Sequence, residues 1–245
     1  MSSSVKNRKV RERTVRNLYS ICAFSWFGIY LGQGFVLRCG KLTFEPLSRI
    51  PHPDEDPFSP RLWLVLDEVV DPQNLGALLR SAFFLGGSGK EQVGVLVCSK
   101  NSAPPSPVVS AASAGALELL TIYSTSNLPR TLSNAKADGF RIVGASSSIP
   151  RRNEDENEES SPPPLHELQD LPAVSKEGRP ILLVLGSEGY GLRSLVAKAC
   201  TEFVRIQPGV ADGFESPDSE VGVDSLNVSV TGGILLWHLL HGSTR

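Results

Sequence analysis

The chain has 245 residues, 40% hydrophobic and 20% charged, a composition typical of a soluble globular protein. Its formal net charge of −2 provides no overall attraction for nucleic acid, so an RNA partner would have to bind through a local basic patch. The four cysteines are far apart and form no CxxC pair, which argues against disulfides or a zinc site and favours a reducing compartment.

We interpret residues 1–50 as an N-terminal extension, because none of the motifs described below lies there. Residues 1–16 carry six lysines or arginines and one acid, Glu12. This pattern fits a solvated tail, an RNA-binding arm or an organelle-targeting segment. Residues 18–37 lack any charge and are long enough to cross a bilayer. Because three glycines and Gln33 dilute their hydrophobicity, we do not expect a membrane span.

From Arg61 onward, strand-like and helix-like segments alternate along the chain. The apolar, strand-like runs fall at 62–66, 93–98, 140–144, 181–185 and 203–206. The helix-like segments fall at about 75–85, 108–118, 127–138, 191–199 and 226–240. Such alternation predicts an α/β domain built around a mostly parallel sheet.

Two segments interrupt this alternation. Residues 146–178 are rich in serine and proline and contain the acidic block 154–159. So many like charges with so few apolar residues predict a disordered surface insertion. A second insertion, 207–224, separates Ile206 from the last motif of the chain.

Polar residues and glycines follow the strand-like runs in three blocks. The first block places Asn74 near the start of a helix and Arg80 in its second turn. In the second block, the run 181–185 ends in a loop with three glycines and one carboxylate, Glu188. The third block begins with Ser225, a favourable N-cap residue, and has Asn227 where free backbone N–H groups can hold an anion. Taken alone, the third block also fits an ordinary buried C-terminal helix.

Other motifs fail on inspection. The stretch 86–90 suggests a phosphate-binding loop, but Phe84 stands where its first glycine belongs and Glu91 where a serine or threonine is needed. The glycines at 186–191 have the wrong spacing for a dinucleotide fingerprint. His238 and His241 have no third candidate ligand nearby in the sequence, so we expect no metal site.

The three blocks, in this order, resemble the signature motifs of the SpoU/TrmH family of RNA ribose 2′-O-methyltransferases, which belongs to the SPOUT class. The matching residues are Asn74, Gly76, Arg80 and Ser81, then Gly186, Glu188, Gly189 and Gly191, then Ser225, Leu226, Asn227, Ser229 and Gly233. Segments 107–110 and 113–116 are similar to the mitochondrial large-subunit rRNA members of the family. Those members often carry a basic residue where this chain has Ala111 and Ala112.

This resemblance implies a SPOUT domain over residues 60–245, with a mostly parallel α/β sheet and a C-terminal deep trefoil knot. It implies that S-adenosylmethionine binds in the knot and that two copies form a homodimer with the active site at their interface. The residues it assigns to cofactor binding are Leu185, Gly186, Gly189, Ile206 and Leu226. Residues 1–50 would then include the truncated remnant of an RNA-binding domain and its linker.

The resemblance also supplies the candidate catalytic residues Asn74, Arg80, Glu188, Ser225 and Asn227. In the family, the arginine matched by Arg80 lies at the reacting hydroxyl, sometimes as the base itself. Because a guanidinium stays protonated, we assign Arg80 to holding a phosphate and stabilising developing alkoxide charge. We expect Glu188 to order the knot by accepting hydrogen bonds. Ser225 and Asn227 are expected to orient the knot loop and the ribose.

The expected function is therefore methyl transfer from S-adenosylmethionine to a ribose 2′-hydroxyl, of a guanosine, in large-subunit rRNA of mitochondria. The alternative is a catalytically weak, knotted RNA-binding or ribosome-assembly factor, in mitochondria or in the cytoplasm. The intact Asn74, Arg80, Glu188 and Asn227 favour the enzyme. The lack of a recognisable N-terminal RNA-binding domain favours the alternative.

Overall fold

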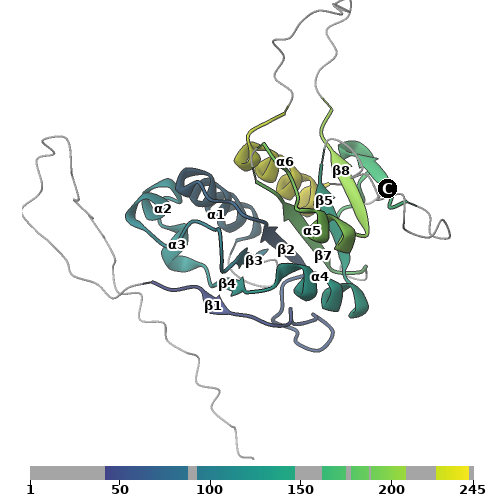
Figure 1. Ribbon diagram of the computed structural model, residues 1–245, viewed down its shortest axis with the longest axis horizontal. Helices are drawn as coiled ribbons and strands as arrows, with labels where there is room; N and C mark the ends of the chain where they lie inside the picture. Colours follow the sequence, from purple (N-terminus) through teal and green to yellow (C-terminus); the bar gives the residue numbers. More distant parts are fainter. Residues whose placement is uncertain are drawn as a thin grey trace, which may run out of the picture. The chain divides into compact units, whose positions relative to one another are not determined.

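Eight strands form a single parallel sheet in the order β1-β4-β3-β2-β7-β5-β8-β6 within the described residues (Figure 1). Their bounds are β1 (Glu45–Pro46), β2 (Leu62–Leu66), β3 (Val93–Cys98), β4 (Ile122–Thr125), β5 (Arg141–Ala145), β6 (Leu165–Glu167), β7 (Ile181–Leu185) and β8 (Glu202–Arg205). Every residue of β2, β3 and β7 is buried, as expected for parallel strands covered on both faces. The prediction of a mostly parallel α/β sheet is confirmed.

The computed structural model describes residues 42–87, 93–146, 162–174, 178–187, 189–207 and 225–242. Thr43–Arg245 form one unit and Met1–Leu42 another. The uncharged run 18–37 lies outside the described residues. Among the helices that are described, none combines the length and the apolar character that a membrane crossing requires.

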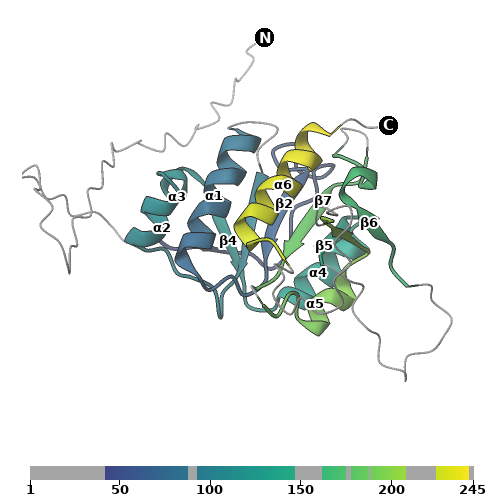
Figure 2. The same ribbon diagram turned by 90° about the horizontal axis from the view of Figure 1, so that it is seen from above.

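Helices cover both faces of the sheet (Figure 2). The first face carries α1 (Pro72–Gly86), α2 (Pro107–Ala112), α3 (Ala116–Leu119) and α6 (Val228–His241). The opposite face carries α4 (Leu128–Ala137) and α5 (Ser194–Ala199). Side chains along β2 point alternately to the two faces of the sheet, and a hydrophobic core lies on each face. Leu64 packs in the core beneath α1 and α6, and Trp63 packs in the core beneath α4 and α5.

The predicted strands agree with the observed ones to within one residue at each end, but β1, β4 and β6 were not predicted. These three are short or half-exposed and carry no continuous apolar run. The helix predicted at 108–118 is instead two helices, α2 and α3. It breaks where Ala114 and Gly115 take positive φ angles of 51° and 90°, which an α-helix cannot accommodate.

The structure differs from the predicted boundaries at two places. Residues 43–50 belong to the folded unit, because β1 pairs with β4 and Ile50 is only 1% exposed. Within the insertion predicted to be disordered, residues 162–174 are placed: β6 pairs with β8, a 3₁₀ turn follows at Leu168–Asp170, and Leu171 is buried. The acidic block 154–159 lies outside the described residues.

Close packing of α6 on α1 brings the start of α6 to the end of β7. A Cβ atom on Gly232 would lie 2.3 Å from Cδ2 of Leu78 and 2.8 Å from Cδ1 of Leu185, so this contact requires glycine. On the other side of α1, a Cβ on Gly76 would lie 2.4 Å from Cβ of Ala112. Ala112 therefore packs closely against α1 at Gly76.

Candidate active site at the carboxyl edge of the sheet

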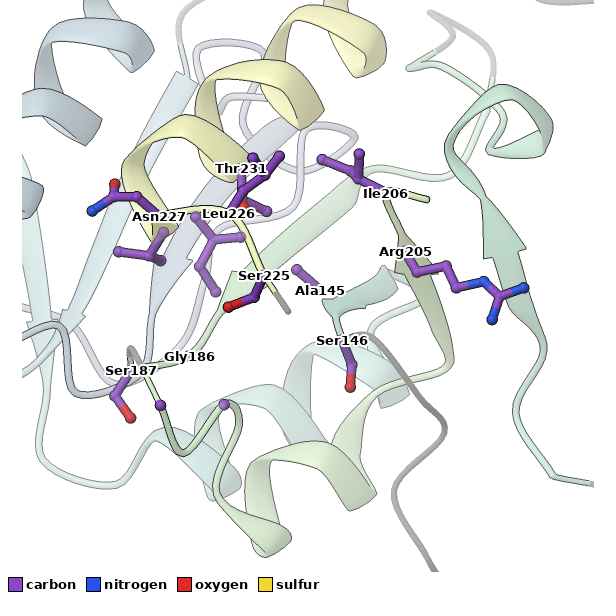
Figure 3. Close-up of a pocket in the computed structure, with 14 residues that line it drawn as sticks. Ala145, Ser146, Gly186, Ser187, Arg205, Ile206, Ser225, Leu226, Asn227 and Thr231 are labelled. Atoms are coloured by element: carbon purple, nitrogen blue, oxygen red, sulfur yellow. The ribbon is translucent and has the colours of Figure 1, made fainter. Parts of the chain in front are cut away.

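A pocket of about 450 Å³ opens at the carboxyl ends of β7, β5 and β8, beside the first residues of α6 (Figure 3). In open α/β sheets, ligands bind outside the carboxyl ends of the strands. Three segments that are distant in the sequence meet at this pocket. Its lining residues are Ala145, Ser146, Leu185, Gly186, Ser187, Gly189, Gly191, Arg205, Ile206, Ser225, Leu226, Asn227, Val228 and Thr231.

The structure brings together all five residues expected to bind the cofactor, because Leu185, Gly186, Gly189, Ile206 and Leu226 all line the pocket. Of the expected catalytic residues, Ser225 and Asn227 line it as well. Figure 3 shows the Arg205 side chain directed away from the pocket centre, toward β6, where it forms an ion pair with Glu167 at 2.5 Å. Arg205 therefore links β8 to the edge strand β6, and its guanidinium does not occupy the pocket.

The loop that follows β7 is folded tightly on itself. Ser187 and Gly191 exchange two backbone hydrogen bonds, of 3.1 and 3.0 Å. A Cβ atom on Gly186 would lie 2.2 Å from the carbonyl carbon and oxygen of Gly191. Gly189 and Gly191 have φ angles of 86° and 66°, which favour glycine. The need for glycine at position 186 thus comes from the loop's own backbone.

An ion pair between the buried Asp67 and the partly exposed Arg193 anchors this loop to the end of β2. Asp67, whose side chain is 0% exposed, accepts hydrogen bonds from Arg193 Nε at 2.8 Å and from the Arg193 backbone N–H at 3.1 Å. Arg193 also contacts Glu68 at 3.1 Å. The hydrogen bond to Asp67 raises the pKa of Arg193 above its ordinary value. Sequence reasoning missed this pair, although a carboxylate directly after a buried strand was a usable signal.

Asn227, and not Ser225, caps α6. The Asn227 Oδ1 atom accepts hydrogen bonds from the Ser229 backbone N–H at 2.8 Å and from Ser229 Oγ at 2.6 Å, and the helix starts at Val228. The prediction that Ser225 is the N-cap is therefore wrong. Two residues before the cap, Ser225 lines the pocket instead.

Asn74 connects the first and third motif blocks. The Asn227 Nδ2 atom donates to Asn74 Oδ1 at 3.0 Å, and Asn74 is only 7% exposed. The backbone N–H of Asn74 is in turn held by the Asp71 carboxylate, the N-cap of α1, at 3.1 Å. Asn74 thus fixes the start of α6 without lining the pocket itself.

The remaining two catalytic candidates are not placed in the pocket. Arg80 lies on α1 with an exposed side chain, and it is absent from the pocket lining. Among the described residues, no carboxylate lies within ion-pair distance of Arg80. Its guanidinium therefore forms no surface ion pair with this part of the chain. Glu188 lies outside the described residues.

No cluster of three or more histidine, cysteine or acidic side chains suited to a metal ion occurs among the described residues. Cys98 and Cys200 are buried free thiols, and burial raises their pKa values to about 11 and about 12. Both thiols are consequently protonated at neutral pH and unsuited to nucleophilic chemistry.

Comparison with known proteins decides the family. The model of the SpoU rRNA Methylase family matches residues 61–237, which include every residue lining the pocket. The chain belongs to this family. Over 206 residues it is 38% identical to human rRNA methyltransferase 1, mitochondrial, covering 83% of this chain and 52% of the human protein. Its likeness to the Dictyostelium discoideum protein of the same name is 35% over 183 residues, covering 75% of this chain and 29% of that protein.

A third SpoU-type relative is the 23S rRNA (guanosine-2′-O-)-methyltransferase RlmB of Pseudomonas putida, 33% identical over 81% of this chain and 63% of that protein. Among solved structures, a TrmH-family protein of Porphyromonas gingivalis superposes with a TM-score of 0.58 and 28% identity, covering 81% of this chain and 63% of that one. The fold also resembles that of Streptomyces viridochromogenes AviRb, solved in complex with AdoMet, with a TM-score of 0.55. The chain thus spans about half the length of the human relative and less than a third of the Dictyostelium one.

Proposed function

We propose that this SpoU-family chain transfers a methyl group from S-adenosylmethionine to the 2′-hydroxyl of a ribose in rRNA. The observation that carries this proposal is that segments of the second and third motif blocks, 185–191 and 225–228, meet with residues 205–206 around one pocket. Relatives that are 33–38% identical are named as rRNA methyltransferases, which supports rRNA as the substrate class.

The pocket fits this cofactor. Its volume of about 450 Å³ lies within the range of small-molecule sites, and Leu185, Ile206 and Leu226 offer apolar surface suited to an adenine ring. Gly186 and Gly189 also line the pocket, and because they lack side chains their backbone is accessible to the polar edges of an adenosyl group. These residues would hold S-adenosylmethionine, which supplies an electrophilic methyl group attached to a sulfonium.

The residues of the chain then have to orient the ribose and allow its 2′-hydroxyl to lose a proton. The 2′-oxygen must form a bond to the methyl carbon as the carbon–sulfur bond breaks, and its proton passes to water or to an RNA phosphate. Ser225 and Asn227 orient the ribose, and Asn74 holds Asn227 in place. Arg80 holds the adjacent phosphate and stabilises the alkoxide charge, because its guanidinium stays protonated.

A homodimer is part of the proposal, because Arg80 does not line the pocket of its own protomer. Large apolar side chains are exposed on the neighbouring helices α1 and α6: Phe84 is 82% exposed, Val230 48% and Trp237 58%. A second copy covering these side chains would remove apolar surface from water. It would also bring Arg80 of one protomer toward the pocket of the other.

The deep trefoil knot of the SPOUT fold is likewise proposed. The chain leaves β8, near one edge of the sheet, and returns as α6 to pack on α1 near the middle of the sheet. Segment 225–227 then lies beside the loop 186–191, which is where a threaded segment would have to pass. A guanosine as the target and a mitochondrial location rest on the names of the relatives alone.

The experiment that tests the function combines calorimetric titration of the full chain with S-adenosylmethionine and a transfer assay on large-subunit rRNA fragments. We expect saturable cofactor binding and transfer of label to RNA. The competing function is an assembly factor, which the position of Arg80 outside its own pocket favours. Binding of both cofactor and RNA without any transfer would establish that alternative.

A further inference from the structure

A second cavity, of about 790 Å³, opens at the same carboxyl edge of the sheet, beyond β3. It is formed by the segment after β1, the residues that end β4, Ser99 after β3, and the first turns of α4. None of its lining residues is shared with the first pocket.

The walls of this cavity are fixed by hydrogen bonds. The Leu47 backbone N–H donates to the Ser124 carbonyl at 2.8 Å, and the Ser99 N–H donates to the Thr125 carbonyl at 2.8 Å. The Asn127 side chain caps α4 by accepting from the Arg130 N–H at 3.1 Å. The cavity is therefore preformed and does not depend on a ligand to order it.

The lining carries positive charge and hydroxyl groups but no carboxylate. Arg49 has its guanidinium held by Asp138 through two contacts of 2.9 Å, so most of its charge is compensated. Arg130 is exposed, and its guanidinium makes no ion pair or hydrogen bond with the described residues. Ser99 and Ser126 add hydroxyl groups to the cavity lining. Arginine with hydroxyl and amide side chains is the combination that proteins use for phosphate oxygens and sugars.

The position of the cavity indicates which phosphate-bearing molecule it takes. Between β7, which ends at the first pocket, and β4, which ends at the second cavity, lie only β2 and β3, so the carboxyl ends of these two strands are about 14 Å apart at a strand spacing of about 4.8 Å. An exposed lysine, Lys100, follows β3 along this path. A nucleic-acid strand of a few nucleotides can reach from one site to the other.

We infer that this cavity binds the sugar–phosphate backbone of the RNA nucleotides that flank the methylated ribose. The inference rests on the proposed function for the identity of the RNA, but not for the existence of the site. Binding of this kind supplies affinity without reading sequence.

The test compares Arg130→Ala with Lys136→Ala in the full chain. Lys136 is an exposed cation on the same helix but does not line the cavity, so both variants lose one charge from α4. Binding of a fluorescent single-stranded oligoribonucleotide is measured by anisotropy at several salt concentrations. For Arg130→Ala we expect roughly fivefold weaker binding and a salt slope reduced by about 0.7 for each phosphate that is no longer neutralised. Lys136→Ala should match the wild type, and Arg130→Lys should keep the salt slope.

Equal behaviour of Arg130→Ala and Lys136→Ala would overturn the inference, as would a wild-type chain that binds no oligoribonucleotide. Cofactor affinity, measured by calorimetry, should be unchanged in both variants, because neither residue lines the first pocket. If the wild type binds RNA but transfers no methyl group, and the two variants still differ, the proposed function fails while the RNA-binding cavity stands.

Discussion

Arg80 is the residue whose role depends most on the proposed homodimer. It lies outside the pocket of its own chain, yet the proposed chemistry needs a cation where charge develops on the 2′-oxygen. Arg80→Ala should therefore lower methyl transfer by at least about a hundredfold, the loss typical of one such donor. Cofactor affinity should hardly change. Single-turnover transfer and calorimetric titration measure the two effects separately.

Arg80→Lys is the matched variant for this prediction. A lysine keeps the charge but cannot form two parallel hydrogen bonds to a phosphate, so it should restore only a small part of the rate. Wild-type turnover by Arg80→Ala would show that Arg80 is a surface residue without a catalytic role.

The cap of α6 gives a second prediction at the residue scale. Asn227→Ala removes the acceptor for the Ser229 N–H and should lower the free energy of unfolding by about 1 kcal/mol. Ser225→Ala should change that free energy by less than about 0.5 kcal/mol, because Ser225 makes no capping bond. Urea denaturation of the two variants decides between the capping residues. Equal destabilisation by both would contradict the assignment of the cap to Asn227.

At the scale of elements, the strands that could be predicted from the sequence are those that consist of continuous apolar runs. Strands β2, β3 and β7 are buried along their whole length, so their hydrophobic runs marked them clearly. Strand β4 reads Ile-Tyr-Ser-Thr and β6 reads Leu-His-Glu, and neither contains a continuous apolar run that would mark a buried strand. These segments form strands because neighbouring strands in the sheet satisfy their backbone hydrogen-bonding groups. Such pairing depends on residues distant in the sequence, so a local sequence pattern does not predict it.

The packing of α6 on α1 depends on one glycine and not on its neighbour. Gly232→Ala would place a Cβ within 2.8 Å of the fully buried Leu78 and Leu185, and should cost about 1–3 kcal/mol. At Gly233 the nearest atom, Ser81 Oγ, is 3.7 Å away, an ordinary contact. Gly233→Ala should be neutral or stabilise the helix by up to about 1 kcal/mol. Thermal unfolding of both variants tests this, and a reversed order would refute the packing described for α6.

At the scale of the whole molecule, the site was more predictable than the domain boundaries. Motif residues from the second and third blocks meet at one pocket, as the resemblance implied, because the sheet order brings β7, β5 and β8 together, while Asn74 of the first block reaches the site only through Asn227. The Asp67–Arg193 pair was missed because it joins residues 126 positions apart, and neither residue is among the matched motif residues. Proline and acidic residues around it likewise hid the buried Leu171.

The revised boundary makes a testable distinction between two truncations. Removing residues 1–42 should leave a folded, cofactor-binding domain, since Thr43–Arg245 form their own unit. Removing residues 1–50 also deletes β1 and the buried Ile50, which should cost about 2 kcal/mol or more. Melting temperatures followed by circular dichroism report the difference. Equal melting temperatures for the two truncations would restore residue 50 as the boundary.

The most direct test of the central claim is to locate the transferred methyl group. The full chain is incubated with methyl-labelled S-adenosylmethionine and a large-subunit rRNA fragment, and the RNA is then hydrolysed in alkali. A methylated 2′-oxygen cannot attack the neighbouring phosphate, so we predict that the label remains in an alkali-resistant dinucleotide. Label recovered in mononucleotides would mean that a base is methylated. The absence of label from RNA, while the chain binds the cofactor, would contradict the assignment as a ribose methyltransferase.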